Sequence, residues 1–330
     1  MLRSEIGGNN KAMDGNTFYF QWEALLIETL QSRMGDTAVA VASFFTLFGE
    51  EVIMIAVLGF LYWVYDKQFA RFVGTNIMVG LIVNPMIKNV VFRRRPYFDI
   101  AGVSCLKPVD GSAGIYDIAA QGYSFPSGHT LNATILYGSL PKYKRNRVLI
   151  VLGIVLPLLV GASRVMLGVH FPTDVLAGWI FGTVILFLVS YLQTHIKRQN
   201  LFHLILFLIA CVGAIYCRTE DYYTGLGIMA GFFLSIPFEE RFVKFAPTRK
   251  ILPAVLRIAG GFVLYFVLNM LLKLPFSDAF LDAATMPAFL VRSVRYAVIL
   301  FVLLGVYPIL FGRIRKIVLK MSGLPRVDLE

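Results

Sequence analysis

The feature that most constrains this chain is a series of long apolar segments separated by short charged or turn-rich breaks. The 330-residue sequence is 57% hydrophobic and only 15% charged, which is too apolar for an ordinary soluble domain. We therefore predict an all-α fold, a polytopic helical membrane bundle. A helix needs about 20 residues to cross the hydrocarbon layer, and the segments that we assign as spans are 50–66, 70–91, 128–141, 147–163, 173–194, 201–217, 224–239, 250–273 and 286–312.

The N-terminal part before the first of these nine spans is organised differently. No apolar run suited to a cleavable signal peptide is visible, and residues 36–49 either extend the first span or form a separate shallow helix. An apolar pattern at helical spacing predicts an amphipathic helix that lies in the membrane interface or packs on the bundle. The residues of this pattern are Phe18, Trp22, Leu25, Leu26 and Leu30.

We divide the chain into an N-terminal segment, 1–49, a membrane core, 50–195, and an additional helical block, 196–330. The last block contains no catalytic motif, and it could line a lipid groove, mediate a homodimer or enlarge the bundle. The spacing of Gly178 and Gly182 predicts close helix packing in the fifth span. The three cysteines are expected to be unpaired thiols: Cys105, Cys211 and Cys217.

The formal net charge of +11 points to membrane orientation and not to nucleic-acid binding. Basic residues of membrane proteins gather in cytoplasmic loops near anionic headgroups, and here the basic loops alternate onto one face of the predicted bundle. We therefore predict a multi-pass protein of the cell (inner) membrane. The opposite, extracytoplasmic face receives the N-terminal segment, the 93–125 loop and the 164–174 turn. The basic loops contain Lys67, Arg71, Lys142, Lys144, Arg145, Arg147, Lys197, Arg198, Arg241, Lys244, Arg249 and Lys250, and the basic tail contains Arg313, Arg315, Lys316 and Lys320.

Three motifs fall on this extracytoplasmic face, and the first supplies cations. Lys88 lies near the outer end of the second span, and Arg95 follows just before Pro96. Both residues are candidate phosphate ligands. Hydrolysis of a phosphate monoester requires a barrier reduction of roughly 20 kcal/mol, and fixed donors of this kind must stabilise the charge on the phosphoryl oxygens. The neighbouring Arg93 and Arg94 are expected to meet an anionic partner, either phosphate or lipid headgroups.

The second motif, Pro126-Ser127-Gly128-His129, opens the third span. Free backbone N–H groups at a helix start bind anions, and glycine allows a ligand to approach the backbone closely. Ser127 adds a hydroxyl donor, so Ser127 and Gly128 are further candidate phosphate ligands. His129 is a candidate general acid for the leaving oxygen.

The third motif contains Ser163-Arg164, His170 and Asp174. Arg164 offers a fork-shaped pair of donors for phosphate oxygens. Asp174 lies four residues after His170 and can accept the proton of one ring nitrogen, which leaves the other nitrogen as a nucleophile. This pattern predicts a covalent phosphohistidine.

Other polar residues in apolar segments are assigned structural roles. His195 and His203 lie away from the motifs, and no metal-ligand spacing appears, since cations surround the two motif histidines. Ion pairing between helices or headgroup contact is expected for Glu50, Glu51, Arg257, Arg292 and Arg295.

The motifs together resemble the signature of the type 2 phosphatidic acid phosphatase (PAP2) superfamily, Lys-x6-Arg-Pro, Pro-Ser-Gly-His and Ser-Arg-x5-His-x3-Asp, over roughly residues 50–195. The resemblance implies a PAP2-type six-helix core with an extracytoplasmic site and catalysis without a metal or other cofactor. It implies that His170 is the nucleophile, that Asp174 orients it and that His129 acts as acid and then base. It assigns phosphate binding to Lys88, Arg95, Ser127, Gly128 and Arg164.

A phosphate site at a bilayer surface predicts a lipid phosphatase with a phosphorylated lipid as its partner. Undecaprenyl pyrophosphate, phosphatidylglycerophosphate and phosphatidic acid are all compatible substrates, because the motifs do not separate branches of the superfamily. The alternatives are a glucose-6-phosphatase-like or sphingosine-phosphate-type phosphatase, a head-group phosphotransferase, and a transporter that only binds its ligand.

Overall fold

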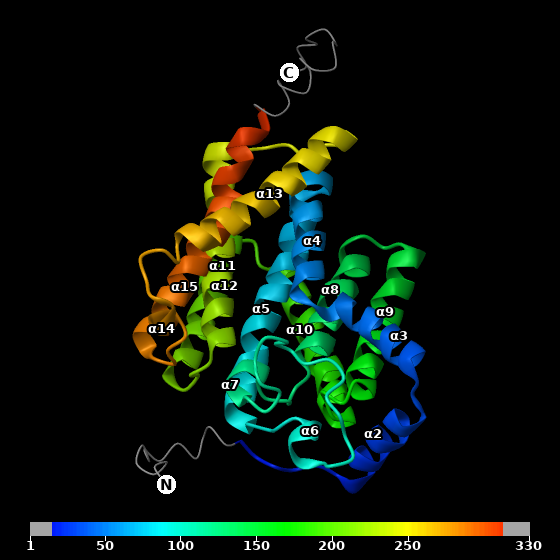
Figure 1. Ribbon diagram of the computed structural model, residues 1–330. Coiled ribbons are helices and arrows are strands. Elements are labelled where there is room, and N and C mark those ends of the chain that lie inside the picture. The colour runs from blue at the N-terminus through cyan, green and yellow to red at the C-terminus, as the bar shows by residue number, and fades with distance from the viewer. Residues whose placement is uncertain (1–14, 313–330) are drawn as a thin grey trace.

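The computed structural model describes residues 15–312, and helices dominate this part of the chain (Figure 1). Four helices form the bundle that carries the three motifs: α5 (Lys67–Val91), α8 (Gly128–Tyr143), α9 (Arg147–Met166) and α10 (Pro172–His195). Helix α8 packs against the other three. The all-α membrane architecture predicted from the apolar segments is confirmed.

Small residues let α8 and α10 approach each other closely. A side chain at Gly178 would place its Cβ only 2.9 Å from the Ser127 carbonyl oxygen, and one at Gly182 would lie 2.8 Å from Thr134 Cβ. Glycine at both positions therefore removes the atoms that would separate the helices. The close packing predicted for this pair of glycines is confirmed.

The nine predicted spans are only partly confirmed. Among the described residues, five helices are long and apolar enough to cross a membrane: α5, α9, α10, α13 (Ile251–Leu271) and the helical stretch Met286–Leu310 that begins with α15 (Met286–Phe301). The predicted spans at 128–141, 201–217 and 224–239 form helices that fall outside this set. They are α8, α11 (Gln199–Val212) with the short η3 (Gly213–Ile215), and α12 (Glu220–Phe238) with the π-helical η4 (Glu239–Val243).

The first predicted span is one half of a bent pair. Helix α3 (Asp36–Thr46) and η1 (Leu47–Gly49) precede α4 (Glu51–Phe60) and η2 (Leu61–Tyr65), and the two halves meet at an angle of 48°. Counted as one broken span, this pair is the sixth candidate. Residues 36–49 are therefore a separate helix and not a straight extension of the first span.

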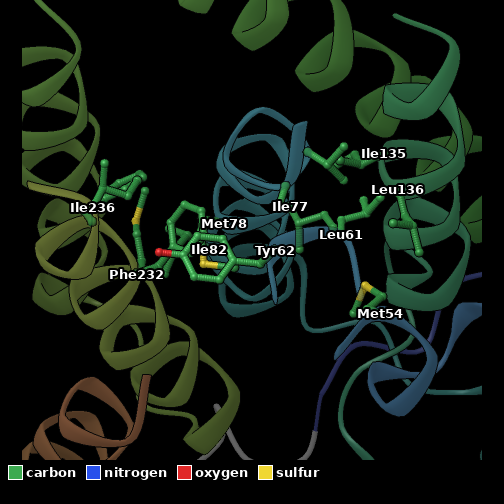
Figure 2. Close-up of a cluster of buried hydrophobic side chains, with 14 of the residues drawn as sticks. Met54, Leu61, Tyr62, Ile77, Met78, Ile82, Ile135, Leu136, Phe232 and Ile236 are labelled. Carbon is green, nitrogen blue, oxygen red and sulfur yellow. The ribbon is translucent and has the colours of Figure 1, made fainter. Parts of the chain in front are cut away.

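The C-terminal helices pack against the four-helix bundle through α5. Figure 2 shows Ile77, Met78 and Ile82 of α5 between α8 residues on one side and Phe232 and Ile236 of α12 on the other. Helix α12 in turn packs closely on α15, which continues into the π-helical η5 (Val302–Val306) and the short η6 (Tyr307–Leu310). Helix α5 is thus shared between the two halves of one apolar core.

The N-terminal helix α2 (Gln21–Arg33) packs on the bundle, which is one of the two alternatives predicted for it. Glu23 and Ile27 are fully buried against the bundle, whereas Trp22, Leu25 and Leu26 of the predicted apolar pattern are between 41% and 65% exposed. Helix α2 therefore packs on the bundle with one face and presents a second, apolar face outward.

The three motifs lie at one end of the bundle, where α5 and α9 finish and α8 and α10 begin (Figure 1). Helix α2, α6 (Pro96–Asp99) and α7 (Ile118–Gln121) cover this end. The opposite end carries the basic loops at 67–71, 142–147 and 241–250. The predicted basic tail, 313–320, lies outside the described residues. The bundle therefore separates the motifs from most of the charged loops.

Candidate active site

The start of α8 is fixed by Ser127, which caps the helix. Its Oγ accepts a hydrogen bond from Thr130 N at 3.5 Å and lies 2.9 Å from Thr130 Oγ1. The backbone N–H of Ser127 donates to the Asp174 carbonyl oxygen at 3.0 Å, which ties the start of α8 to the start of α10. Gly128 lies against Asn84, whose amide donates to the Pro126 carbonyl oxygen at 3.2 Å.

His170 reaches its place through a tight turn after α9. Gly168 has a φ of +71°, and a Cβ there would lie 2.3 Å from the Ser104 carbonyl oxygen, so only glycine fits this turn. Two residues later His170 is 1% exposed, with Nδ1 facing Asp174 Oδ2 at 3.5 Å. Asp174 stands in the first turn of α10, where Phe171 N donates to its Oδ2 at 2.7 Å.

The second ring nitrogen of His170 faces the first motif. Arg95 Nη1 lies 3.4 Å from His170 Nε2 and donates to the Val169 carbonyl oxygen at 2.9 Å. The rest of the guanidinium is held by the 97–123 loop, because Nε donates to the carbonyl oxygens of Gln121 and Gly122, both at 3.0 Å. Arg95 is therefore held beside the second ring nitrogen of His170.

Arg164 is a buried cation whose donors are only partly satisfied. Its side chain is 2% exposed, and Nη1 donates to Thr46 Oγ1 at 2.8 Å. The buried Nε and Nη2 have no hydrogen-bond partner in the part of the chain that the structure describes. Buried donors without a partner carry a free-energy cost of about 1–3 kcal/mol, more when charged, so such a pair marks a place where an anion would be stabilised.

Lys88 and His129 complete the group. A Cβ built on Gly122 would lie 3.9 Å from Lys88 Nζ and 4.0 Å from Arg95 Nη2, so both cations reach one point beside the loop. His129 is the second residue of α8, in the helical turn that Ser127 caps. The structure therefore brings all eight predicted site residues to one end of the bundle. Several of them already use polar groups in contacts within the protein, among them Ser127, Arg95, Arg164 and Asp174.

The electrostatics of the site favour a neutral nucleophile. Burial, together with the nearby positive charges of Arg95, Arg164 and Lys88, holds the pKa of His170 well below its ordinary value. An unprotonated imidazole has a free lone pair, which nucleophilic attack requires. The same cations supply a strongly positive environment for a phosphate group.

The interpretation of Arg93 as a contact for phosphate or lipid headgroups is wrong. Arg93 is 2% exposed and pairs with Asp174 at 2.7 Å and with Glu23 at 2.8 Å. Arg94 pairs with Asp99 at 3.3 Å. The anionic partners of this arginine run are therefore carboxylates of the chain itself.

Sequence reasoning also missed Ser124 and Glu23. The Ser124 hydroxyl donates a short hydrogen bond to Asp174 Oδ2 and lies 3.4 Å from His170 Nδ1. Nothing in the local pattern distinguishes this serine. The position of Glu23 could have been noticed, because a glutamate at the third position of a helix often caps the first turn. Glu23 does so here, since its carboxylate accepts a hydrogen bond from Phe20 N at 2.9 Å.

Most of the polar residues assigned structural roles do have structural contacts. His203 stacks on Phe233, and His195 lies at the far end of α10, stacked on Tyr191. The predicted ion pairs are found for Glu50, with Lys107, and for Arg292, with Glu220. They are not found within residues 15–312 for Glu51, Arg257 or Arg295. Arg257 donates to two backbone carbonyl oxygens, and Arg295 donates to an amide. The three cysteines are free, as predicted.

Known proteins resemble parts of this chain. Phosphatidylglycerophosphatase B of Bacillus subtilis (strain 168) is 40% identical over 85 residues, which are 23% of this chain and 42% of that protein. Undecaprenyl-diphosphatase of Sulfolobus acidocaldarius is 29% identical over 150 residues, which are 44% of this chain and 66% of that protein. Lipid A 1-phosphatase of Rhizobium etli is 32% identical over 113 residues, which are 33% and 43% of the two proteins. The chain thus covers less than two thirds of each relative.

A solved structure and two family models complete the comparison. The crystal structure of a transmembrane PAP2 type phosphatidylglycerolphosphate phosphatase from Bacillus subtilis is 25% identical, has a TM-score of 0.41 and covers 54% of this chain and 87% of its own. The PAP2 superfamily model matches residues 68–198, and the model of the PAP2 superfamily phosphatase transmembrane extension matches residues 223–318. These two matches together cover more than half of the sequence and include the three motifs. The chain therefore belongs to the PAP2 superfamily.

Proposed function

We propose that this multi-pass membrane protein is a phosphatase that hydrolyses a lipid phosphate or pyrophosphate through a phosphohistidine intermediate. The substrate class includes phosphatidylglycerophosphate, undecaprenyl pyrophosphate and phosphatidic acid. Support comes from the three relatives, which are a phosphatidylglycerophosphatase, an undecaprenyl-diphosphatase and a lipid A 1-phosphatase. The site end of the bundle is assigned to the extracytoplasmic side of the cell membrane, since most basic loops lie at the other end.

The observation that carries the proposal is the pair of buried, unpartnered donors on Arg164 beside His170. A phosphoryl group bound there would accept hydrogen bonds from Arg164 Nε and Nη2 and would meet Lys88 and Arg95. Such contacts grow stronger as negative charge develops on the phosphoryl oxygens in the transition state. The N–H groups at the start of α8 supply further donors from Gly128 and His129.

The proposed reaction has two steps. In the first, His170 Nε2 attacks phosphorus, the ester oxygen leaves with a proton from His129, and Asp174 stabilises the charge that forms on the His170 ring. In the second, His129 takes a proton from water, the water oxygen attacks phosphorus, and the bond to Nε2 breaks. Inorganic phosphate is released. The Asp174 contact at 3.5 Å in the free protein would tighten as the ring becomes charged.

No metal is needed in this scheme, because three cations already neutralise the phosphoryl oxygens and would repel a divalent ion. The ester part of the substrate would lie in the bilayer while its phosphate enters the end of the bundle. A lipid substrate therefore fits a site between the helix ends and the headgroup layer.

The proposal is tested with the purified protein in detergent and a panel of phosphorylated lipids, with glucose 6-phosphate and a chelator present. Phosphate release from at least one lipid is expected, and His170→Ala should abolish that release without loss of expression. Addition of an acceptor alcohol separates a hydrolase from a phosphotransferase. Loss of activity on chelation, or retained turnover by His170→Ala, contradicts the proposed chemistry.

A further inference from the structure

Arg93 occupies a buried position behind the candidate catalytic pair. Its guanidinium uses every nitrogen: Nε donates to the Phe18 carbonyl oxygen at 2.9 Å, Nη1 donates to Thr173 Oγ1 and Asp174 Oδ1, both at 2.7 Å, and Nη2 donates to Glu23 Oε2 at 2.8 Å. Its charge lies between two aromatic rings, 4.8 Å from the centre of Phe18 and 4.0 Å from that of Phe171. Arg93 is thus a fully satisfied cation with one fixed geometry.

Glu23 of α2 is the second member of this arrangement. It is 0% exposed, and both carboxylate oxygens have donors. Oε1 accepts from Thr173 N at 3.1 Å and from Thr173 Oγ1 at 2.5 Å, while Oε2 accepts from Arg93 and from Phe20 N. Glu23 therefore joins α2 both to Arg93 and to the first turn of α10, directly beside Asp174.

The two carboxylate oxygens of Asp174 have different partners. Oδ1 faces away from the site and accepts from Arg93, whereas Oδ2 accepts from Phe171 N and Ser124 and faces His170. Fixing one oxygen of a planar carboxylate fixes the other as well. Arg93 also places a positive charge 2.7 Å from Asp174 Oδ1, which favours the ionised form of this buried carboxyl group.

We propose that Glu23 and Arg93 are positioning residues, which hold Asp174 ionised and oriented toward His170, so that α2 is a working part of the active site. This inference rests on the proposed function, because it assigns a role in that reaction. Glu23 acts through Arg93, and Arg93 acts through Asp174. Neither residue needs to touch the substrate, and the phosphate ligands Lys88 and Arg164 are not part of this network.

Glu23 lies on a helix outside the segments that match the family models. Helix α2 precedes both segments that match the family models, 68–198 and 223–318. Its outward face exposes Trp22, Leu25 and Leu26, on either side of the buried Glu23. The residue that anchors Arg93 thus comes from an element outside the three motifs.

The test compares Arg93→Gln and Glu23→Gln with a matched control, Arg94→Gln. Arg94 is the adjacent residue, and its side chain is 30% exposed and pairs with Asp99, so the control removes the same charge without touching Asp174. Steady-state kinetics use phosphatidylglycerophosphate in detergent, and inhibition by inorganic phosphate reports the phosphate site separately.

The expected result is a split between kcat and KM. Misplacement of a reacting group by about 1 Å can cost about 100-fold in rate, so we expect Arg93→Gln to lower kcat about 100-fold and Glu23→Gln about 10-fold. KM and the inhibition constant for inorganic phosphate should stay within about twofold of wild type, and Arg94→Gln should match wild type. The double variant should be no slower than Arg93→Gln alone, because coupled residues are not additive.

Three results would overturn the inference. They are an unchanged kcat in both variants, a kcat loss in Arg94→Gln equal to that in Arg93→Gln, and a parallel rise in KM and the phosphate inhibition constant, which marks a general structural defect. If Arg93→Gln does not purify as a folded protein, Glu23→Gln, which preserves side-chain size, decides the matter. Wild-type protein that is inactive on the whole lipid panel would instead contradict the proposed function.

Discussion

At the residue scale, burial gives His170 and Arg164 properties that they would lack at a surface. His170 is enclosed among cations and stays neutral, while Arg164 keeps its charge but lacks partners for two donors. An anion in the site would change both conditions at once. It would satisfy the guanidinium and would favour protonation of the imidazole.

The protonation state of His170 can be measured directly. Because burial and nearby cations lower its pKa, the ring should remain neutral as the pH falls below about 6.5, the ordinary histidine value. An NMR titration of histidine-labelled protein in detergent, assigned with His170→Ala, checks this. Inorganic phosphate should raise the pKa, since an anion stabilises the imidazolium. Titration of the free protein at or above the ordinary value would contradict the electrostatic description.

The fork shape of Arg164 should matter more than its charge. Lysine at this position keeps a positive charge but cannot direct two parallel donors at one phosphoryl group. We expect Arg164→Lys to lower kcat/KM by about 10²-fold, the lower end of the cost of removing one transition-state donor. Arg147→Lys, at the other end of α9, serves as the matched control and should be active. Equal activity of both variants would exclude Arg164 from phosphate binding.

At the element scale, the contact between α8 and α10 positions the second and third motifs relative to each other. Ser127 N donates to the Asp174 carbonyl oxygen, and Gly178 lies beneath the same turn. A small displacement of α8 would therefore move His129 relative to His170. The precision of the site depends on helix packing as well as on the motif residues.

Substitution of Gly178 tests this dependence. A Cβ at this position would approach backbone and must push the helices apart, which costs about 1–3 kcal/mol for overpacking. We expect Gly178→Ala to lower both Tm and kcat. Leu176→Ala changes an exposed side chain on the same helix and should alter neither quantity strongly. Full activity and stability of Gly178→Ala would show that the helices tolerate separation.

Sequence patterns identified most elements of the site, and the reasons are local. Each motif residue lies at a helix end marked by proline, glycine or a change of hydropathy, so the ends of α5 and α9 and the starts of α8 and α10 could be predicted. The start predicted for the third span, residue 128, is the first residue of α8, with Ser127 as its cap. Arg93 and Glu23 could not be paired in advance, because their contact spans 70 residues and depends on where α2 docks.

At the scale of the whole molecule, a buried charge cluster joins the motif-bearing bundle to the C-terminal helices. Glu239 of η4 is fully buried and pairs with Arg71 at 2.5 Å and with Lys67 at 2.9 Å, both on α5. Glu240 pairs with the same arginine but is half exposed. The number of spans was hard to predict, because some helices of the bundle, such as the 16-residue α8 and the short apolar helix Gln199–Ile215, are shorter than a lone span needs to be.

Neutralising Glu239, the buried carboxylate of this cluster, should destabilise the whole protein. Glu239→Gln leaves Lys67 and Arg71 short of a buried partner, and breaking a buried ion pair costs about 3–5 kcal/mol. We expect its Tm in detergent to fall by several degrees. Glu240→Gln removes a charge from the same arginine at an exposed position and should have a much smaller effect. Equal Tm values for both variants would mean that the cluster does not join the two halves.

The covalent intermediate is the most direct test of the central claim. Protein mixed with a ³²P-labelled lipid phosphate is denatured at alkaline pH within the first turnovers, and the label is located by peptide mass spectrometry. We predict label on His170 that is stable in alkali, is lost in acid and is chased by unlabelled substrate. Label on another residue, or steady turnover by a protein that never carries phosphate, would contradict the account.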